Sequence, residues 1–139
     1  MIVYLDTSSL VKLYVEEDGS SAIAALVKSA KVAATSMVAY PEARAAFARR
    51  FREMSFTSAD HQRIKTCFNR DWRDYFIVNL AEDAILMAGN LAEKHALRGF
   101  DSIHLAAALI LRQETSLSVT FSCFDDRLLS AAAAEGFLV

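Results

Sequence analysis

The sequence predicts an α/β fold in which a central, mostly parallel, twisted sheet of about four or five strands carries helices on both faces. Short apolar, β-prone runs alternate along the chain with longer segments of helical periodicity. The chain has 139 residues, 54% of them hydrophobic, which is enough for one compact unit with a real core. With one proline, four glycines and no linker-like stretch, we expect one domain over residues 1–139.

The first quarter of the chain predicts two strands separated by helices. Residues 2–5 form a short apolar run that ends at the polar run 6–9 (DTSS), whose side chains commonly cap helices. A helix is expected over residues 10–14, and a second over residues 22–30, where apolar side chains recur at helical spacing. Residues 32–35 then predict the second strand.

The rest of the chain continues the alternation of helices and strands. Ser36 is expected to cap a helix that runs to about Met54 and has Glu42 in its early part. Pro41 lies close enough to the helix start to be tolerated but one turn late for an ideal start, which leaves room for a bend there. The later elements are a helix that follows Thr57-Ser58 and runs to about residue 74, a strand over 75–79, helices over 81–95 and 103–111, a strand over 117–124 and a helix over 127–135. We expect a stop near Gly99 and caps at Asp101-Ser102.

The charge pattern restricts the partners of the chain. A net charge of −2 argues against a protein that coats nucleic acid indiscriminately, because such binding needs many basic groups. The middle third nevertheless has a basic excess: Arg44, Arg49, Arg50, Arg52, Arg63, Lys65, Arg70 and Arg73. This excess fits either an RNA-binding face or ordinary solvated helix faces.

Composition also predicts the compartment. The apolar opening residues are interrupted at once by Asp6, and no later apolar run approaches the length of a membrane span. We therefore expect no signal peptide, no transmembrane segment and no membrane partner. Cys67 and Cys123 lie far apart without CxxC spacing, which predicts two reduced thiols in a cytoplasmic protein.

Four acidic side chains are expected to meet at the carboxyl edge of the sheet, where open parallel sheets bind ligands. Asp6 follows the first strand and Asp125 the last. Glu42 and Asp101 lie in the first turns of helices. Converging carboxylates persist as anions when a cation neutralises them, which predicts Mg²⁺ or Mn²⁺ rather than zinc, and phosphodiester hydrolysis as the natural chemistry.

These residues also have structural interpretations. Asp6 and Asp101 are common N-cap types, and Glu42 could pair with a nearby arginine. His104 lies in an apolar run and is expected to be packed or hydrogen-bonded rather than a general base. The aromatic residues at one helix-to-strand junction are expected in the core rather than stacked on bases: Trp72, Tyr75 and Phe76.

Four segments resemble the acidic motifs of PIN-domain ribonucleases, most closely those of VapC-type toxins from bacterial and archaeal toxin–antitoxin pairs. They are YLDTSSLVKLY (4–14), YPEARAAFAR (40–49), RGFDSIHLAAAL (98–109) and FSCFDDRLLSAA (121–132). The resemblance spans essentially the whole chain. It implies that Asp6, Glu42 and Asp101 are catalytic metal ligands, that Asp125 completes the quartet and that Ser8 supports Asp6.

The resemblance further implies a metal-dependent endoribonuclease, a cognate antitoxin that places an Arg or Lys among the carboxylates, and a homodimer. Asp126 is the competing fourth acid, and Cys123 stands where similar proteins often carry Thr or Ser. One alternative is a catalytically weak PIN-like module that binds RNA or protein. A phosphatase with an aspartate nucleophile ranks lower, because Ser8 occupies the place of its second aspartate.

Overall fold

The computed structural model describes residues 1–139 and confirms the α/β class. Its sheet has four parallel strands in the order β3-β2-β1-β4. The strands are β1 (Ile2–Leu5), β2 (Val32–Ser36), β3 (Phe76–Val78) and β4 (Val119–Ser122). Ile2 of the inner strand β1 lies opposite Val32 on one side and Val119 on the other. The N-terminal segment is therefore the structural centre of the sheet.

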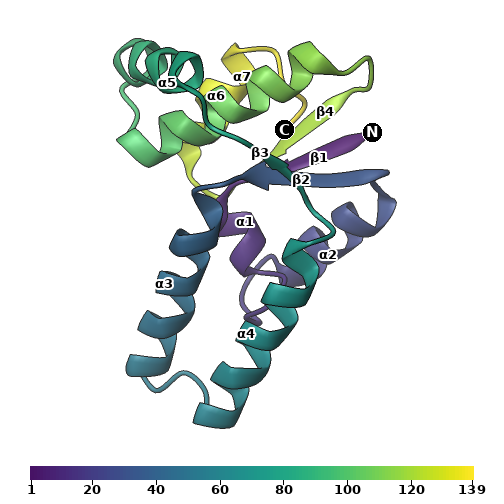
Figure 1. The fold of residues 1–139 in the computed structure, drawn as a ribbon, viewed down its shortest axis with the longest axis vertical. Helices are drawn as coiled ribbons and strands as arrows, with labels where there is room; N and C mark the ends of the chain where they lie inside the picture. The colour runs from purple at the N-terminus through teal and green to yellow at the C-terminus, as the bar shows by residue number, and fades with distance from the viewer.

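Seven helices cover the two faces of the sheet, as predicted. They are α1 (Thr7–Val11), α2 (Ser20–Ser29), α3 (Ala39–Arg52), α4 (Ser58–Trp72), α5 (Glu82–His95), α6 (Gly99–Glu114) and α7 (Asp126–Ala134). Figure 1 shows α5, α6 and α7 on one face and α1 to α4 on the other, with α3 and α4 extending away from the sheet as a two-helix arm. No helix is both long and apolar enough to span a bilayer.

The strand β1 feeds both hydrophobic layers because its side chains alternate between the two faces. Ile2 and Tyr4 belong to the cluster formed with α5, α6 and α7. Val3 and Leu5 belong to the cluster formed with α1 to α4. All four side chains are buried, as expected for a parallel strand covered on both sides. Asp6 directly follows this fully buried strand, so its backbone position is fixed by the packing of both hydrophobic layers.

The helix starts follow capping chemistry at several predicted places. Asp6 caps α1, and Asp125 caps α7 by accepting the Leu128 N–H at 2.9 Å. Thr57 caps α4 in a reciprocal capping box with Asp60. The start of α3 differs from the prediction. Ser36 is the last residue of β2 rather than an N-cap, and α3 begins at Ala39.

The delayed start of α3 also changes the position of Pro41. Pro41 lies in the first turn of the helix, where a missing N–H breaks no intrahelical hydrogen bond. The proline is therefore compatible with a regular start, and the predicted offset of one turn is wrong. Glu42 lies in the same turn, as predicted.

The boundary between α5 and α6 also differs from the prediction. The stop is Ala96, which adopts a left-handed conformation at φ 54°, while the Leu97 N–H returns to the Ala92 carbonyl at 3.0 Å. Helix α6 already begins at Gly99, so Gly99 starts a helix instead of ending one. Asp101 consequently lies inside the first turn of α6 and is not its cap.

The aromatic prediction for residues near β3 is only partly right. Trp72 packs on Phe68, Tyr75 packs on Trp72, and both rings border the hydrophobic cluster formed with α1 to α4, so these two rings are structural. Phe76 is 49% exposed on the edge strand β3, and its expected place in the core is wrong. An edge strand has no neighbour on its outer side, which leaves part of such a side chain in solvent.

Candidate active site

All four predicted acidic residues lie at the carboxyl edge of the sheet. Asp6 directly follows β1, and Asp125 lies three residues beyond β4. Glu42 and Asp101 lie in the first turns of α3 and α6. Strands β2 and β3 lie on one side of β1, and β4 lies on its other side. The direction of strand order therefore reverses at β1, and the topological switch point falls between β1 and β4. Open parallel sheets bind their ligands at such a point.

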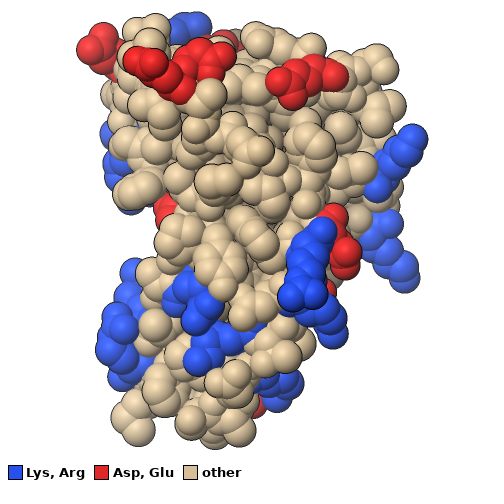
Figure 2. All heavy atoms as spheres, viewed as in Figure 1, with Lys and Arg blue, Asp and Glu red and all other residues tan.

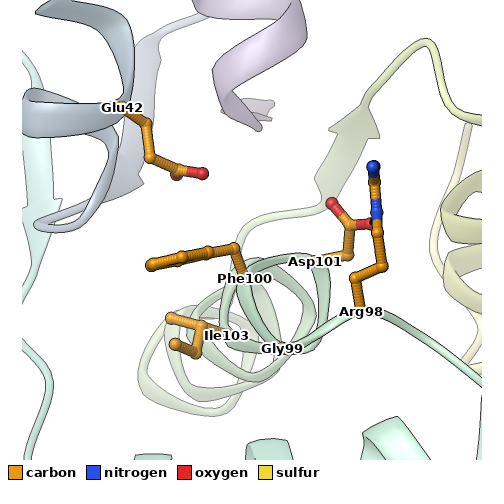
Figure 3. Close-up of a pocket in the computed structure, with 6 residues that line it drawn as sticks. All are labelled: Glu42, Arg98, Gly99, Phe100, Asp101 and Ile103. Atoms are coloured by element: carbon orange, nitrogen blue, oxygen red, sulfur yellow. Dashed lines mark hydrogen bonds and ion pairs between the residues drawn. The ribbon is translucent and has the colours of Figure 1, made fainter. Parts of the chain in front are cut away.

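Two open pockets meet at this edge. The first has a volume of about 510 Å³ and is lined by Glu42, Arg98, Gly99, Phe100, Asp101 and Ile103. Figure 3 shows the Glu42 carboxylate reaching into it from α3, with Asp101 on the far side and the Phe100 ring on the same side of the pocket as Glu42. The second pocket, of about 490 Å³, contains Asp125 and shares Arg98 and Asp101 with the first. Arg98 and Asp101 therefore lie at the boundary of one divided crevice.

Asp6 is the most buried of the four acids, with 4% of its surface exposed. Its Oδ1 accepts hydrogen bonds from Ser8 Oγ at 2.7 Å and the Ser9 N–H at 2.9 Å. Burial raises the pKa of Asp6, and these two hydrogen bonds offset only part of that rise. Ser8 also accepts the Phe124 N–H at 3.2 Å, which ties the α1 start to the loop after β4.

Glu42 is held by a hydrogen-bonded network that crosses the end of the sheet. Its Oε1 accepts from Thr7 Oγ1 at 2.7 Å and from His104 Nε2 at 2.9 Å. A carboxylate only accepts, so Nε2 carries a proton, and Nδ1 on the other side of the ring pairs with the Tyr4 hydroxyl at 2.8 Å. Burial favours a higher pKa for Glu42, but the hydrogen bonds and the His104 and Arg98 charges outweigh it and lower the pKa.

Asp101 and Asp125 share one exposed arginine. Arg98 Nε lies 2.9 Å from Asp101 Oδ2, and Arg98 Nη2 lies 3.8 Å from Asp125 Oδ2. The hydrogen bond and charge of Asp101, followed by the charge of Asp125, raise the pKa of Arg98. Asp126 also lines the second pocket, but it is exposed and has no basic partner. Of the two neighbouring aspartates, Asp125 is the one that faces the shared arginine.

The oxygen atoms of the site fit a hard divalent cation. Asp6 Oδ2, Glu42 Oε2 and Asp101 Oδ1 make no hydrogen bond or ion pair within the chain. None of them is a fully buried atom without a partner, so each keeps some contact with solvent. Carboxylate oxygens of this kind suit Mg²⁺ and Mn²⁺.

The carboxylates are nevertheless held apart in this arrangement. No three His, Cys, Asp or Glu side chains are close enough together to hold a metal ion at once. Like charges repel, and Arg98 supplies the positive charge between Asp101 and Asp125. The assignment of the four acids as metal ligands therefore stays a prediction.

Several side chains of the site carry no recognisable signal in the sequence. Tyr4 and His104 are 100 positions apart and meet only in the fold. His104 is buried and hydrogen-bonded, as predicted, but its contact with Glu42 was not foreseen. Arg98 and Phe100 next to Asp101 were also missed. Phe100 is 58% exposed inside the first pocket, where a large apolar ring would otherwise be expected to avoid solvent.

The Cys123 thiol is unsuited to nucleophilic chemistry. Both Cys67 and Cys123 are free thiols, in agreement with the sequence. Burial, followed by the charge of Asp6, raises the pKa of Cys123 to about 12, so the thiol stays protonated at neutral pH. Its Sγ lies 3.7 Å from the Asp125 carbonyl oxygen, a weak contact.

Comparison with known proteins gives consistent matches over nearly the full length. The family model described as the PIN domain matches residues 3–134, a span that contains all four acidic residues. Two proteins of Mycobacterium tuberculosis, named Ribonuclease VapC45 and Ribonuclease VapC49, are each 37% identical to the chain over 139 residues. Each alignment covers 97% of this chain and 92% of the relative.

Proposed function

The chain belongs to the PIN-domain family, and from this premise we propose that it is a metal-dependent endoribonuclease that acts as the toxin of a toxin–antitoxin pair. The names of the two mycobacterial relatives support ribonuclease activity. The observation that carries the proposal is that Asp6, Glu42 and Asp101 meet at the carboxyl edge of the sheet. Each uses one carboxylate oxygen in hydrogen bonds within the chain and keeps the other free of such bonds.

Asp6, Glu42 and Asp101 are the proposed metal ligands, and Asp125 is the fourth acid. When bound, Mg²⁺ or Mn²⁺ activates a water and neutralises the non-bridging phosphate oxygens of the RNA. The chain itself supplies the orientation of the carboxylates. Ser8 fixes Asp6, while the Tyr4–His104 pair presents a proton to Glu42 and keeps it ionised.

The first pocket suits a nucleotide beside the cleaved bond. Phe100 provides an exposed aromatic surface in the pocket that Glu42 and Asp101 also line. Bases stack on such rings with little dependence on their identity. Arg98 is 77% exposed at the boundary of the crevice, so its guanidinium can turn from Asp101 toward a phosphate at little cost. The pocket thus combines a stacking surface with a charged group for the backbone.

The first test is digestion of total cellular RNA by the purified protein, free of any inhibitor, in Mg²⁺ or Mn²⁺ and in EDTA. We expect discrete fragments from the wild type, none in EDTA, and none from Asp6→Asn or Asp101→Asn. The exposed Asp74→Asn is the matched control because it makes the same change away from the crevice. Cleavage that survives in both site variants would refute the carboxylate mechanism, and no cleavage of any RNA would favour the non-catalytic binding module.

A second pair of variants tests the fourth acid. Asp125→Asn should lose most of the cleavage, whereas Asp126→Asn should keep it, because only Asp125 faces Arg98. Asparagine is as good an N-cap as aspartate, so α7 keeps its start in the Asp125 variant. The opposite ranking of the two variants would move the assignment to Asp126.

The proposal includes a homodimer and an antitoxin that inhibits by charge. Arg98 already shows that a guanidinium fits between Asp101 and Asp125, which supports inhibition by an inserted Arg or Lys. Such an antitoxin should lose inhibition when that residue is replaced by Gln. Light scattering should give about twice the chain mass of 15.3 kDa for the antitoxin-free protein, and a single chain mass would exclude a stable dimer.

A further inference from the structure

The four arginines of α3 differ in their partners. Arg44 Nη1 donates to the Tyr40 hydroxyl at 2.7 Å, and the guanidinium lies 5.6 Å from the centre of the Tyr40 ring. Arg50 Nη1 lies 2.9 Å from Glu17 Oε2. These two arginines are held by their own chain, and each has a structural role.

Arg49 and Arg52 lack such partners. Arg52 is exposed and makes no ion pair or side-chain hydrogen bond within the chain. Arg49 has only a loose pair with Glu53, at 3.8 Å, in which both side chains are more than half exposed. Exposed pairs of this kind contribute little. Figure 2 shows that Lys and Arg side chains gather on the two-helix arm, to which α3 belongs.

Arg49 and Arg52 lie on the same face of α3 as Glu42. Positions 42, 45, 49 and 52 follow helical spacing, and a groove of about 380 Å³ is lined by Thr7, Glu42, Ala45, Ala46, Arg49 and Arg52. The alanines between Glu42 and the arginines leave this groove open. With a rise of 1.5 Å per residue, Arg49 and Arg52 lie about 10 and 15 Å along the helix from Glu42. They are outside the acidic crevice but directly continuous with it.

An acidic crevice on a chain of net charge −2 repels the RNA that it is proposed to cut. We infer that Arg49 and Arg52 form a binding track for the phosphate backbone of a single RNA strand, leading from Glu42 along α3. The inference rests on the proposed ribonuclease function and adds where the strand lies beyond the cleaved bond. Guanidinium groups suit this role because they bind phosphate oxygens in a bidentate manner.

The competing explanation is structural. Both arginines lie in the last turn of α3, where positive charge stabilises the helix dipole. That role would lower the melting temperature of a variant without changing its response to salt when it binds RNA. Loss of a phosphate contact instead weakens the salt dependence of RNA binding, because fewer condensed counterions are released when the RNA binds.

The test is RNA binding by the intact protein in EDTA, measured by fluorescence anisotropy with a labelled single-stranded RNA of mixed sequence at several NaCl concentrations. The variant is Arg49→Gln combined with Arg52→Gln. The matched control is Arg63→Gln combined with Arg70→Gln, two exposed arginines of α4 paired with their own acids. Glu53→Gln is a third variant, which frees Arg49 from its only partner.

The Arg49/Arg52 variant should lower the magnitude of the slope of log affinity against log salt by about 1.4, since each single-strand phosphate contact accounts for about 0.7. If both proteins bind RNA equally at 1 M salt, this difference in slope makes the variant bind about 25-fold more weakly at 0.1 M salt. The control should change the slope by much less, and Glu53→Gln should bind more tightly than wild type. A melting temperature that falls while the slope stays unchanged would establish the helix-dipole role and overturn the track.

Cleavage assays on the same proteins separate this inference from the proposed function. If wild type cuts no RNA but its salt slope falls in the Arg49/Arg52 variant, the track stands and the nuclease function fails. If wild type cuts RNA and the variant binds it with the wild-type slope, the track is wrong and the nuclease function stands. A wild-type protein without measurable RNA binding also overturns the track, as does an equal loss in the Arg63/Arg70 control.

Discussion

Replacement of Tyr4 by Phe tests the network that holds Glu42. The change removes one hydroxyl from a side chain that is fully buried and stacked on Phe121, with ring centroids 5.4 Å apart. The ring keeps its packing, but His104 Nδ1 loses its hydrogen-bond partner. Because His104 is only 1% exposed, solvent does not readily replace that partner.

A buried polar group left without a partner destabilises a protein by about 1 to 3 kcal/mol, so we expect a loss of about 2 kcal/mol. An unfolding entropy of about 2.1 cal/mol/K per residue gives about 0.29 kcal/mol/K for 139 residues. The melting temperature should therefore fall by about 7 °C. Cleavage should fall by about 10- to 100-fold, the usual effect of removing a side chain that orients a metal ligand.

Thermal melts followed by circular dichroism measure the first quantity, and RNA digestion in Mn²⁺ measures the second. Thr66→Val is the control, because Thr66 is exposed and its hydroxyl bonds the Gln62 carbonyl where water can replace it. We expect the control to change stability by no more than about 0.5 kcal/mol. Equal melting temperatures for Tyr4→Phe and wild type would show that the hydroxyl does not stabilise His104, and the reasoning would fail.

Three further predictions concern charge. Asp6→Asn should stabilise the metal-free protein by about 1 kcal/mol, because burial disfavours the charged form of Asp6. The same variant should show no rise in melting temperature when Mn²⁺ is added. A variant less stable than wild type without metal would contradict the first expectation. Arg98→Ala should tighten Mn²⁺ binding several-fold in calorimetry, and weaker binding would show that Arg98 does not compete for the acids. Hydrogen bonds from Lys94 and His95 lower the pKa of Glu135, so its contribution is present above about pH 4.3 and is lost as the pH falls further. The lost stability is less than about 1 kcal/mol, because the Lys94–Glu135 pair is accessible to solvent. Thermal melts of Glu135→Gln from pH 7 to pH 3 should lack this acid-induced loss, and a variant with the same pH profile as wild type would contradict the prediction.

The sequence predicts the layers and the edge of the site well because both depend on local patterns. Asp6 and Asp125 follow short apolar strands and have side chains that cap helices, so their places at the carboxyl edge follow from their neighbours. Glu42 lies early in its helix because the helix begins soon after β2 ends, although Ser36 is not the cap. Those patterns extend over only a few residues, which is why single-sequence reasoning can find them.

The errors occur where distant contacts decide the conformation. Ser36 looks like a cap, but it pairs with Val78 in the sheet, and this pairing extends β2 by one residue. Ala96 ends α5 in a conformation that usually favours glycine, next to the buried Leu97. The Tyr4–His104–Glu42 network connects three separate elements. No local pattern specifies such contacts, so they appear only in the structure.

The position of β1 in the sheet has a consequence for the synthesis of the protein. Ile2 pairs with Val119, 117 residues further along the chain, so the sheet cannot close until β4 has been made. At about 5 to 20 residues per second, translation needs roughly 6 to 23 s for that distance. Asp6 thus leaves the ribosome early but waits for Asp101 and Asp125. We expect the nascent chain to remain inactive toward neighbouring RNA until its last strand and helix have emerged.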